Sequence, residues 1–321
     1  MTGRELFFYM LEGKETDQVP CSLTMYNNFI LATGQADQPW RGGMDPFGVN
    51  WIATKEGCIP EPGRFLFEDI ADWKEYVHFP DLDSLGFEKV APLELSKADR
   101  DNKVQVLFSV CGLFERMAAF MGFENTLIAL IEDPKSCHEF LDAFADYKIA
   151  VFERAYELYH PDMYIMFDDI ATARGLFMSI ETWREIFKPH LKKIVDAVRA
   201  KGVIYGQHTC GKCEDAIADY VELGIRYWHS AQSMNDLEKI LKTYGKDMIV
   251  DGGWDSSGPA SYIGATVEQA IAETRRMREA YGSYNNFIMT PVLLNEKGNS
   301  LLVGDERLPV IIEEWAKISK R

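Results

Sequence analysis

The chain has 321 residues, a net charge of −16, and 47 % hydrophobic and 12 % aromatic residues. This composition is typical of a folded soluble protein and excludes a disordered chain. The excess of 50 acidic over 34 basic residues argues against nucleic-acid binding, because phosphate neutralisation requires clustered Lys and Arg. No stretch approaches about 18 uncharged apolar residues and the start lacks a signal-peptide pattern, so we expect a cytoplasmic protein without membrane contact.

Short apolar runs and helical periodicity alternate along most of the chain. After a predicted helix at Arg4–Glu15, strands are expected at Val19–Met25, Gly48–Thr54, Val104–Val110, Met163–Asp168, Val203–Gln207, Ile225–His229, Asp247–Gly252 and Phe287–Thr290. Helices are expected at Leu113–Met121, Pro134–Tyr159, Ile180–Ala200, Cys213–Leu223, Asn235–Tyr244, Val267–Tyr281 and Asp305–Ser319. Residues 56–101 are interrupted by prolines, which indicates a long excursion between the second and third strands.

Eight apolar strands alternating with helices predict an α/β protein in which a parallel sheet closes into a (β/α)8 TIM barrel. We expect one domain over residues 1–321, with an N-terminal helical extension. An open doubly wound sheet is the alternative. No Gly-x-Gly-x-x-Gly motif follows the first strand and no phosphate-binding loop is present, so the barrel is favoured.

Polar and aromatic residues gather at the predicted carboxyl ends of the strands, where such barrels place their chemistry. The candidate substrate-binding residues are Tyr26, Asn27, Trp51, Phe167, Gln207, Trp228, His229 and Trp254. Of these, the aromatic residues Tyr26, Trp51, Phe167, Trp228 and Trp254 are predicted to form apolar walls for a flat ring. Asp168, Asp169 and His208 are the candidate catalytic residues.

The segment from Gly202 to Cys213 predicts a metal site. His208 and Cys210 lie two residues apart at the end of a predicted strand, so their side chains point to the same side. An imidazole and a thiolate in this arrangement can bind Zn²⁺, and a catalytic zinc usually takes three protein ligands. The third ligand is open between Cys213 and an aspartate of the neighbouring strand, Asp168 or Asp169.

Four segments resemble the uroporphyrinogen decarboxylase superfamily in order and spacing. They are Asp168-Asp-Ile, Ile186-Phe-Lys-Pro-His-Leu-Lys-Lys193, His208-Thr-Cys-Gly211 and Asp251-Gly-Gly253. The resemblance implies an eight-stranded barrel, in agreement with the strand count. The decarboxylases carry Arg-Gln-Ala-Gly-Arg after the first strand, whereas this chain has Leu23-Thr-Met-Tyr-Asn-Asn28 without an arginine. A substrate rich in carboxylates would lack its guanidinium partners here.

The other branch of the superfamily comprises corrinoid-dependent methyltransferases, some of which bind zinc through His-x-Cys and a distant cysteine. His208 and Cys210 match the first two ligands, but no cysteine follows Phe287. This difference argues against the type that activates the thiol of coenzyme M. Asp45-Pro-Phe-Gly-Val-Asn-Trp51 and Asp69-Ile-Ala-Asp-Trp-Lys-Glu-Tyr-Val77 look like the first methyltransferase of anaerobic O-demethylases.

A zinc motif of the O-demethylase group has the spacing of Glu124, Glu139 and His160 in this chain. The helix predicted over Pro134–Tyr159 would hold Glu139 and His160 ~30 Å apart, too far to share an ion. We therefore expect Glu139 and His160 to be surface groups.

The resemblance implies a methyltransferase that moves a methyl group from a small methylated substrate, a phenyl methyl ether, to Co(I) of a corrinoid protein. The implied cofactors are Zn²⁺ and a corrinoid (cobalamin) carried by that partner, and a homodimer is compatible with the sequence. Zinc at His208 and Cys210 would act on the leaving oxygen, and Asp168 or Asp169 would position the substrate or supply a proton. The alternatives are a decarboxylase and a non-catalytic metal- or corrinoid-binding protein.

Overall fold

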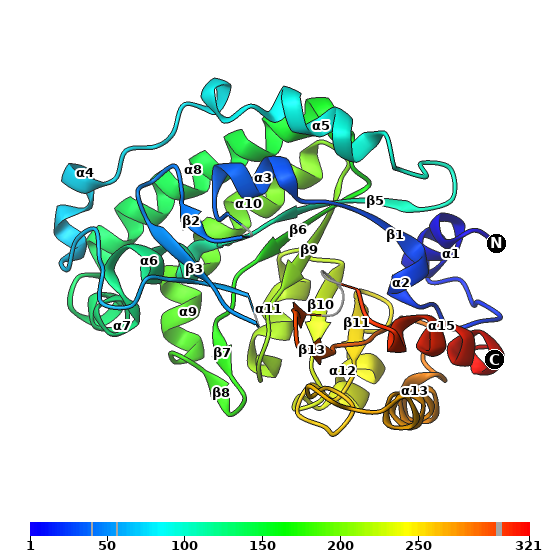
Figure 1. Cartoon of the computed structure of the whole chain (residues 1–321). Coiled ribbons are helices and arrows are strands. Elements are labelled where there is room, and N and C mark those ends of the chain that lie inside the picture. Colours follow the sequence, from blue (N-terminus) through cyan, green and yellow to red (C-terminus); the bar gives the residue numbers. More distant parts are fainter. Residues whose placement is uncertain (40, 56, 300–303) are drawn as a thin grey trace.

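The centre of the molecule is a curled parallel sheet of seven strands, seen in a computed structural model that describes residues 1–39, 41–55, 57–299 and 304–321 (Figure 1). In spatial order the strands are β1 (Tyr26–Phe29), β5 (Val104–Ser109), β6 (Met163–Phe167), β9 (Ile204–His208), β10 (Tyr227–Ala231), β11 (Ile249–Gly253) and β12 (Phe287–Thr290). All neighbouring pairs are parallel. The carboxyl ends of the strands therefore share one edge.

The first strand lies later in the chain than the sequence predicted. Within the predicted strand Val19–Met25, Cys21 makes an isolated parallel bridge to Met289 of β12, and the chain then forms the short helix α2 (Ser22–Met25) before β1. Pro20 has no N–H to donate to a ladder, and the Thr24 hydroxyl donates to the Cys21 carbonyl at 3.0 Å, which favours a turn. The bridge links this segment to the far edge of the sheet.

The predicted second strand, Gly48–Thr54, is not part of the parallel sheet. Its central residues form β3 (Asn50–Ala53) in an antiparallel sheet with β2 (Gly43–Met44) and β4 (Cys58–Pro60). The predicted count of eight barrel strands is therefore wrong for this segment. An apolar run of this length does not reveal which sheet it joins.

An apolar core fills the inside of the curled sheet. Val106, Ile165, Tyr227 and Ile288 belong to it, and helix α1 (Gly3–Leu11) adds Phe7 and Met10. α1 lies at the amino edge of the sheet, close to β1 (Figure 1). This is the N-terminal helical extension that the sequence predicted.

Helices cover the outside of the sheet and form a second, larger core with it. They are α3 (Leu31–Ala36), α4 (Trp73–Tyr76), α5 (Phe87–Leu95), α6 (Leu113–Met121), α7 (Phe123–Glu132), α8 (Pro134–Tyr159), α9 (Ile180–Ile186), α10 (Lys188–Ala200), α11 (Ile217–Glu222), α12 (Leu237–Tyr244), α13 (Val267–Tyr281) and α15 (Arg307–Ile318). Three short 3-10 turns are described: η1 (Ile70–Asp72), η2 (Leu82–Leu85) and η3 (Glu214–Ala216). Two small antiparallel hairpins pair β7 (Ala171–Thr172) with β8 (Gly175–Leu176), and β13 (Leu294–Asn295) with β14 (Gly298–Asn299). The predictions for α6, α8 and α13 are confirmed.

The single helix predicted over Ile180–Ala200 is two helices, α9 and α10, which meet at Phe187. Pro189 is the cause, because proline removes a helical hydrogen bond and its ring clashes with the carbonyl four residues earlier. It occupies the first turn of α10, where an N–H would have no helical partner.

Two buried ion pairs attach the segment between β1 and β5 to the helices. The Asp45 carboxylate accepts from Arg116 of α6 at 2.7 Å and from Trp51 Nε1 at 2.9 Å. Lys148 of α8 donates to Asp37 at 2.7 Å. All four charged side chains are fully buried. The Asp45–Arg116 pair thus holds the antiparallel sheet β2–β3–β4 over α6. Burying these charges costs desolvation free energy, which the attraction within each pair must offset.

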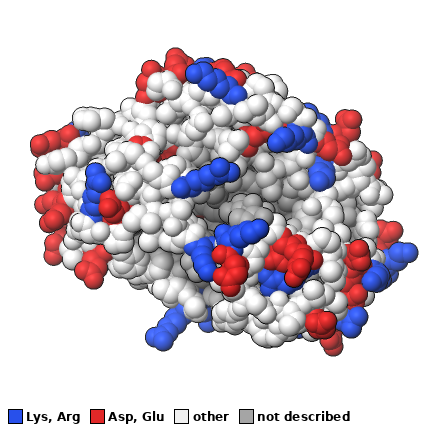
Figure 2. All heavy atoms as spheres, viewed as in Figure 1, with Lys and Arg blue, Asp and Glu red and all other residues white. Residues whose placement is uncertain are grey.

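No helix in the described part of the chain is long and apolar enough to cross a membrane. Basic and acidic side chains are interspersed over the face shown in Figure 2, which is hollowed near its centre. A continuous basic stripe of the kind that binds nucleic acid is not visible on that face.

Candidate functional site

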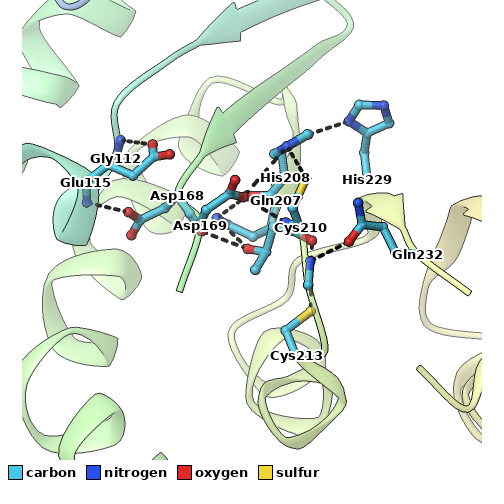
Figure 3. A network of polar contacts seen from close by, with 12 residues as sticks. Gly112, Glu115, Asp168, Asp169, Gln207, His208, Cys210, Cys213, His229 and Gln232 are labelled. Atoms are coloured by element: carbon cyan, nitrogen blue, oxygen red, sulfur yellow. Dashed lines mark hydrogen bonds and ion pairs between the residues drawn. The ribbon is translucent and has the colours of Figure 1, made fainter. Parts of the chain in front are cut away.

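Asp169, His208 and Cys210 form a cluster at the carboxyl edge of the sheet (Figure 3). β6 and β9 pair in register up to Phe167 and His208, so the residues that follow each strand meet. The His208 Nε2 atom lies 3.3 Å from the Cys210 sulfur and 3.8 Å from Asp169 Oδ1. The ligand atoms of all three residues lie within 4.8 Å of one another. The sequence prediction that His208 and Cys210 face the same side is confirmed.

The His208 ring is held on both sides. Phe167 stacks on the His208 ring with ring centroids 3.8 Å apart. The Nδ1 atom of His208 lies 2.7 Å from Nδ1 of His229. Burial lowers the pKa of His208 to about 3, so the ring is neutral near pH 7 and has a lone pair available for a metal. Phe167 and His229, both predicted site residues, therefore lie in the site around the imidazole.

The loop after β9 brings Cys210 against Asp169. The Cys210 backbone N–H donates to Asp169 Oδ1 at 2.7 Å, and the Gln232 side chain accepts from the Gly211 N–H at 2.7 Å. Gly211 has a φ of +83°, and a Cβ there would lie 2.6 Å from the Ala171 carbonyl oxygen, so the loop requires glycine. Burial and the neighbouring Asp169 raise the pKa of the Cys210 thiol well above its ordinary value.

Asp168 has a different position from its neighbour. Its carboxylate accepts hydrogen bonds from the backbone N–H groups of Phe114 and Glu115, at the start of α6, at 3.0 and 3.1 Å. A Cβ on Gly112 would lie 2.4 Å from the Asp168 Cβ, so the close approach depends on that glycine. Burial raises the pKa of Asp168 to about 7. Asp168 joins β6 to α6, and its catalytic role stays a prediction.

Cys213, predicted as a zinc ligand, is not in the cluster. Its sulfur is fully buried beside the Thr209 carbonyl oxygen, 3.9 Å away, and Figure 3 shows Cys213 apart from His208 and Asp169. Cys213 precedes the turn η3 and packs into the outer core. The third residue of the cluster is Asp169, one of the alternatives for the third ligand in the sequence analysis.

Three other predicted residues point out of the barrel, because alternate side chains of a strand face opposite sides. Gln207 and Trp228 lie next to the inward-facing His208 and His229 in the chain, and Trp228 and Trp254 belong to the outer core. Trp228 Nε1 donates to the Thr209 carbonyl and Trp254 Nε1 to Ser261 Oγ. Gln207 Nε2 donates to the His208 carbonyl. These three side chains therefore do not face the cluster, and their contact with a substrate stays a prediction.

Tyr26 and Asn27 are also misplaced by the prediction, because they begin β1 instead of following the first strand. Asn27 donates to the Asp99 carbonyl and to Gln105 Oε1 at 2.8 and 3.2 Å, at the amino end of β5. The Tyr26 hydroxyl donates to Asp251 inside the barrel at 3.3 Å. Neither residue lies at the carboxyl edge.

A cavity of about 510 Å³ adjoins the cluster through Asp169. Trp51 lines it, as does Glu115 of α6, a residue that the sequence analysis missed. Burial and the charges of Asp169 and Asp168 raise the pKa of Glu115 well above its ordinary value. The available signal was its position: Glu115 lies in the first turn of the helix that follows β5, at the carboxyl edge.

Glu124, Glu139 and His160 are all exposed. Glu139 pairs with Lys74 at 2.6 Å, and His160 ends α8. The expectation that Glu139 and His160 are surface groups is confirmed.

The fold and the cluster together define an α/β barrel-like protein with a candidate metal centre at the carboxyl edge of its sheet. The model of the family described as uroporphyrinogen decarboxylase (URO-D) matches residues 46–291, and the chain belongs to this family. A solved methyltransferase from Methanosarcina mazei has a similar fold, with a TM-score of 0.69, 14 % sequence identity and 99 % of each chain covered. No curated protein matches the sequence.

Proposed function

We propose that the chain is a methyltransferase that moves a methyl group from a small methylated donor, a phenyl methyl ether, to Co(I) of a separate corrinoid protein, with Zn²⁺ as its metal. The observation that carries the proposal is the group of one carboxylate, one imidazole and one thiol at the carboxyl edge. Membership of the URO-D family and the methyltransferase with a similar fold support it. The proposal treats the curled sheet as a TIM barrel with the segment around Cys21 in the eighth position.

The donor set fits zinc. Oxygen, nitrogen and sulfur ligands are those that zinc takes, and three protein ligands leave one position open for a substrate atom. Burial of the acidic groups Asp169 and Glu115 raises their pKa values, and the described residues pair no Lys or Arg with either. A cation at this place would relieve their repulsion.

Bound zinc would supply Lewis acidity to the ether oxygen of the donor. Asp169, His208 and Cys210 would hold the metal, and Phe167 and His229 would keep the His208 ring in position. In the transfer, the electron pair of Co(I) forms the new bond to the methyl carbon. The methyl–oxygen bond breaks, its electron pair stays on oxygen, and the phenolate takes a proton from water after release.

The decarboxylase alternative has less support in this chain. The residues from Leu23 to Asn28 form α2 and the start of β1 and include no arginine. A substrate with several carboxylates needs bidentate cationic partners. The cavity beside the cluster is lined by Asp169 and Glu115, and its basic residue, Arg64, is already paired with Glu61.

The test combines metal analysis with methyl transfer. Purified protein is expected to contain about one zinc per chain and to methylate a reduced corrinoid protein when a phenyl methyl ether is supplied. His208→Ala and Cys210→Ala should each lose the metal and the transfer, whereas Cys213→Ala should keep both. Zinc without methylation would favour a non-catalytic binding protein. Carbon dioxide release from uroporphyrinogen would favour a decarboxylase.

A further inference from the structure

The loop that carries Cys210 is held by residues outside its own strand. Each backbone N–H from Thr209 to Cys213 donates to an acceptor in another segment of the chain. The acceptors are the carbonyls of His229 and Thr172 and the side-chain oxygens of Asp169, Gln232 and Asn235, all at 2.7 to 2.9 Å. The position of the Cys210 sulfur is therefore set by neighbouring segments and not by β9 alone.

The three candidate ligands have nearly the spacing that zinc requires. Tetrahedral zinc with nitrogen, oxygen and sulfur ligands places those atoms roughly 3.4–3.6 Å apart. His208 Nε2 lies 3.3 Å from the Cys210 sulfur and 3.8 Å from Asp169 Oδ1, so both distances are within about 0.5 Å of that range. A site this close to its working geometry depends on the groups that hold each ligand in place.

Gln232 is the contact that holds the loop directly after Cys210. Gly211 has a φ of +83°, so the chain turns sharply there, and the Gln232 Oε1 atom accepts from the Gly211 N–H at 2.7 Å. Figure 3 shows the Gln232 side chain reaching from the end of β10 to this loop. Because glycine leaves the backbone free to adopt several directions, the turn needs an external contact to fix one of them.

The second amide of the loop after β10, Asn235, has a broader role. It is buried, it donates to the carbonyls of Gly211 and Gln232, and it accepts from the Cys213 N–H, so it joins the two loops as a whole. The half-buried side chain of Gln232 makes one hydrogen bond within the described part of the chain, the contact with Gly211. Its loss would remove a support of Cys210 and leave the rest of both loops bonded.

We propose that Gln232 is a positioning residue of the metal site, which fixes the Cys210 sulfur beside His208 and Asp169 through the Gly211 N–H. The inference rests on the proposed function, in which these three residues bind zinc. It adds to that function a residue that touches neither the metal nor the substrate.

Two variants of Gln232 test this role through zinc affinity. Gln232→Met has a similar length without the accepting oxygen, and it should weaken zinc binding about 10–100-fold. Gln232→Glu keeps an acceptor for Gly211 and adds negative charge near the ion, so it should bind zinc at least as tightly as the wild type. Titration of the purified proteins against a competing chelator gives the three affinities.

Cobalt(II) in place of zinc separates positioning from a general loss of stability. Its sulfur-to-metal charge-transfer band reports the Cys210 thiolate, and its visible bands report the coordination geometry. At saturating cobalt the wild type and Gln232→Glu should give the same spectrum, whereas Gln232→Met should lose charge-transfer intensity. A variant that is only less stable would keep the wild-type spectrum in its folded fraction.

Ser233→Ala is the matched control in the same loop. The Ser233 hydroxyl donates to Asp255 at 3.1 Å and not to the Cys210 loop, so this variant should keep both the zinc affinity and the cobalt spectrum. Wild-type affinity and spectrum in Gln232→Met would overturn the proposal. Equal losses in the Met and Glu variants, or a wild-type protein that binds neither metal, would overturn it as well.

These metal titrations need no corrinoid protein, so the two proposals fail separately. Zinc binding that depends on Gln232 but is never followed by methyl transfer would refute the function and leave the role of Gln232 intact. Methyl transfer by the wild type, together with unchanged metal binding in Gln232→Met, would refute the role of Gln232 and leave the function intact.

Discussion

At the end of a strand, neighbouring residues point to opposite sides of the sheet. A difference of one position therefore decides whether a side chain lies inside or outside the barrel. His208 and Gln207 are adjacent, yet one joins the metal cluster and the other packs outside. The predicted ends of β9 and β10, at Gln207 and His229, fall one and two residues before the observed ends at His208 and Ala231, and a shift of one residue reverses every side chain of a strand. For that reason the pair His208 and Cys210 was predictable, whereas the direction of Trp228 was not.

His229 is expected to orient the metal ligand. If His208 binds the metal through Nε2, its Nδ1 carries the proton and donates to Nδ1 of His229, 2.7 Å away. Partners of this kind typically change metal affinity 10–100-fold. His229→Phe should therefore weaken zinc binding by about that factor, while His229→Asn should bind nearly as well because its Oδ1 replaces the accepting nitrogen. Competition with a chromophoric chelator measures both.

The other histidine pair of the molecule provides the control. His138 of α8 lies 3.0 Å from His190 of α10 on the outside of the sheet, and His138→Phe should leave zinc affinity unchanged. Equal zinc affinities of the His229→Phe and His229→Asn variants would show that the contact with His229 does not position His208.

Elements with an unbroken pattern were predicted well, and those that depend on distant partners were not. The 26 residues of α8 carry a regular apolar stripe, so both ends were predictable. β3 pairs with β2 and β4, and Asp45, next to β2, is bound by Arg116, a partner 71 positions away. Such a contact leaves no periodic signal, so the antiparallel sheet and the cavity under it were missed.

Helix α1 should contribute strongly to stability although it precedes the sheet. Phe7 is fully buried and meets Tyr26 and Tyr227 edge to face, with ring centroids 6.1 and 6.0 Å apart. Phe7→Ala should lower the free energy of unfolding by about 3–5 kcal/mol. Tyr9 on the same helix is 41 % exposed, and Tyr9→Ala should cost less than about 1 kcal/mol. Urea denaturation of both variants measures these free energies of unfolding. Similar losses in the two variants would show that α1 does not close the barrel core.

At the scale of the whole molecule, buried acids make stability depend on pH. Asp251 is fully buried inside the barrel, where it accepts hydrogen bonds from Tyr227 and Thr290. Burial raises the pKa of Asp251 to about 6. Since the fold favours the protonated form, this contribution to stability is complete below pH ~4 and is lost as the pH rises through about 6.

Asp251→Asn should remove this dependence. Between pH 4 and 8 the unfolding free energy of the wild type should fall relative to that of the variant by about 3 kcal/mol, from a pKa shift of about two units. Denaturant titrations of both proteins at each pH give the difference directly. A difference that stays constant over the range would mean that Asp251 remains ionised in the folded protein.

The antiparallel sheet β2–β3–β4 shares no residue with the three candidate metal ligands, yet it provides one side of the cavity beside them. Substitutions in this sheet can therefore accumulate during evolution without disturbing Asp169, His208 or Cys210. The sheet is therefore the region in which the shape of this cavity can be altered while the three candidate ligands stay in place.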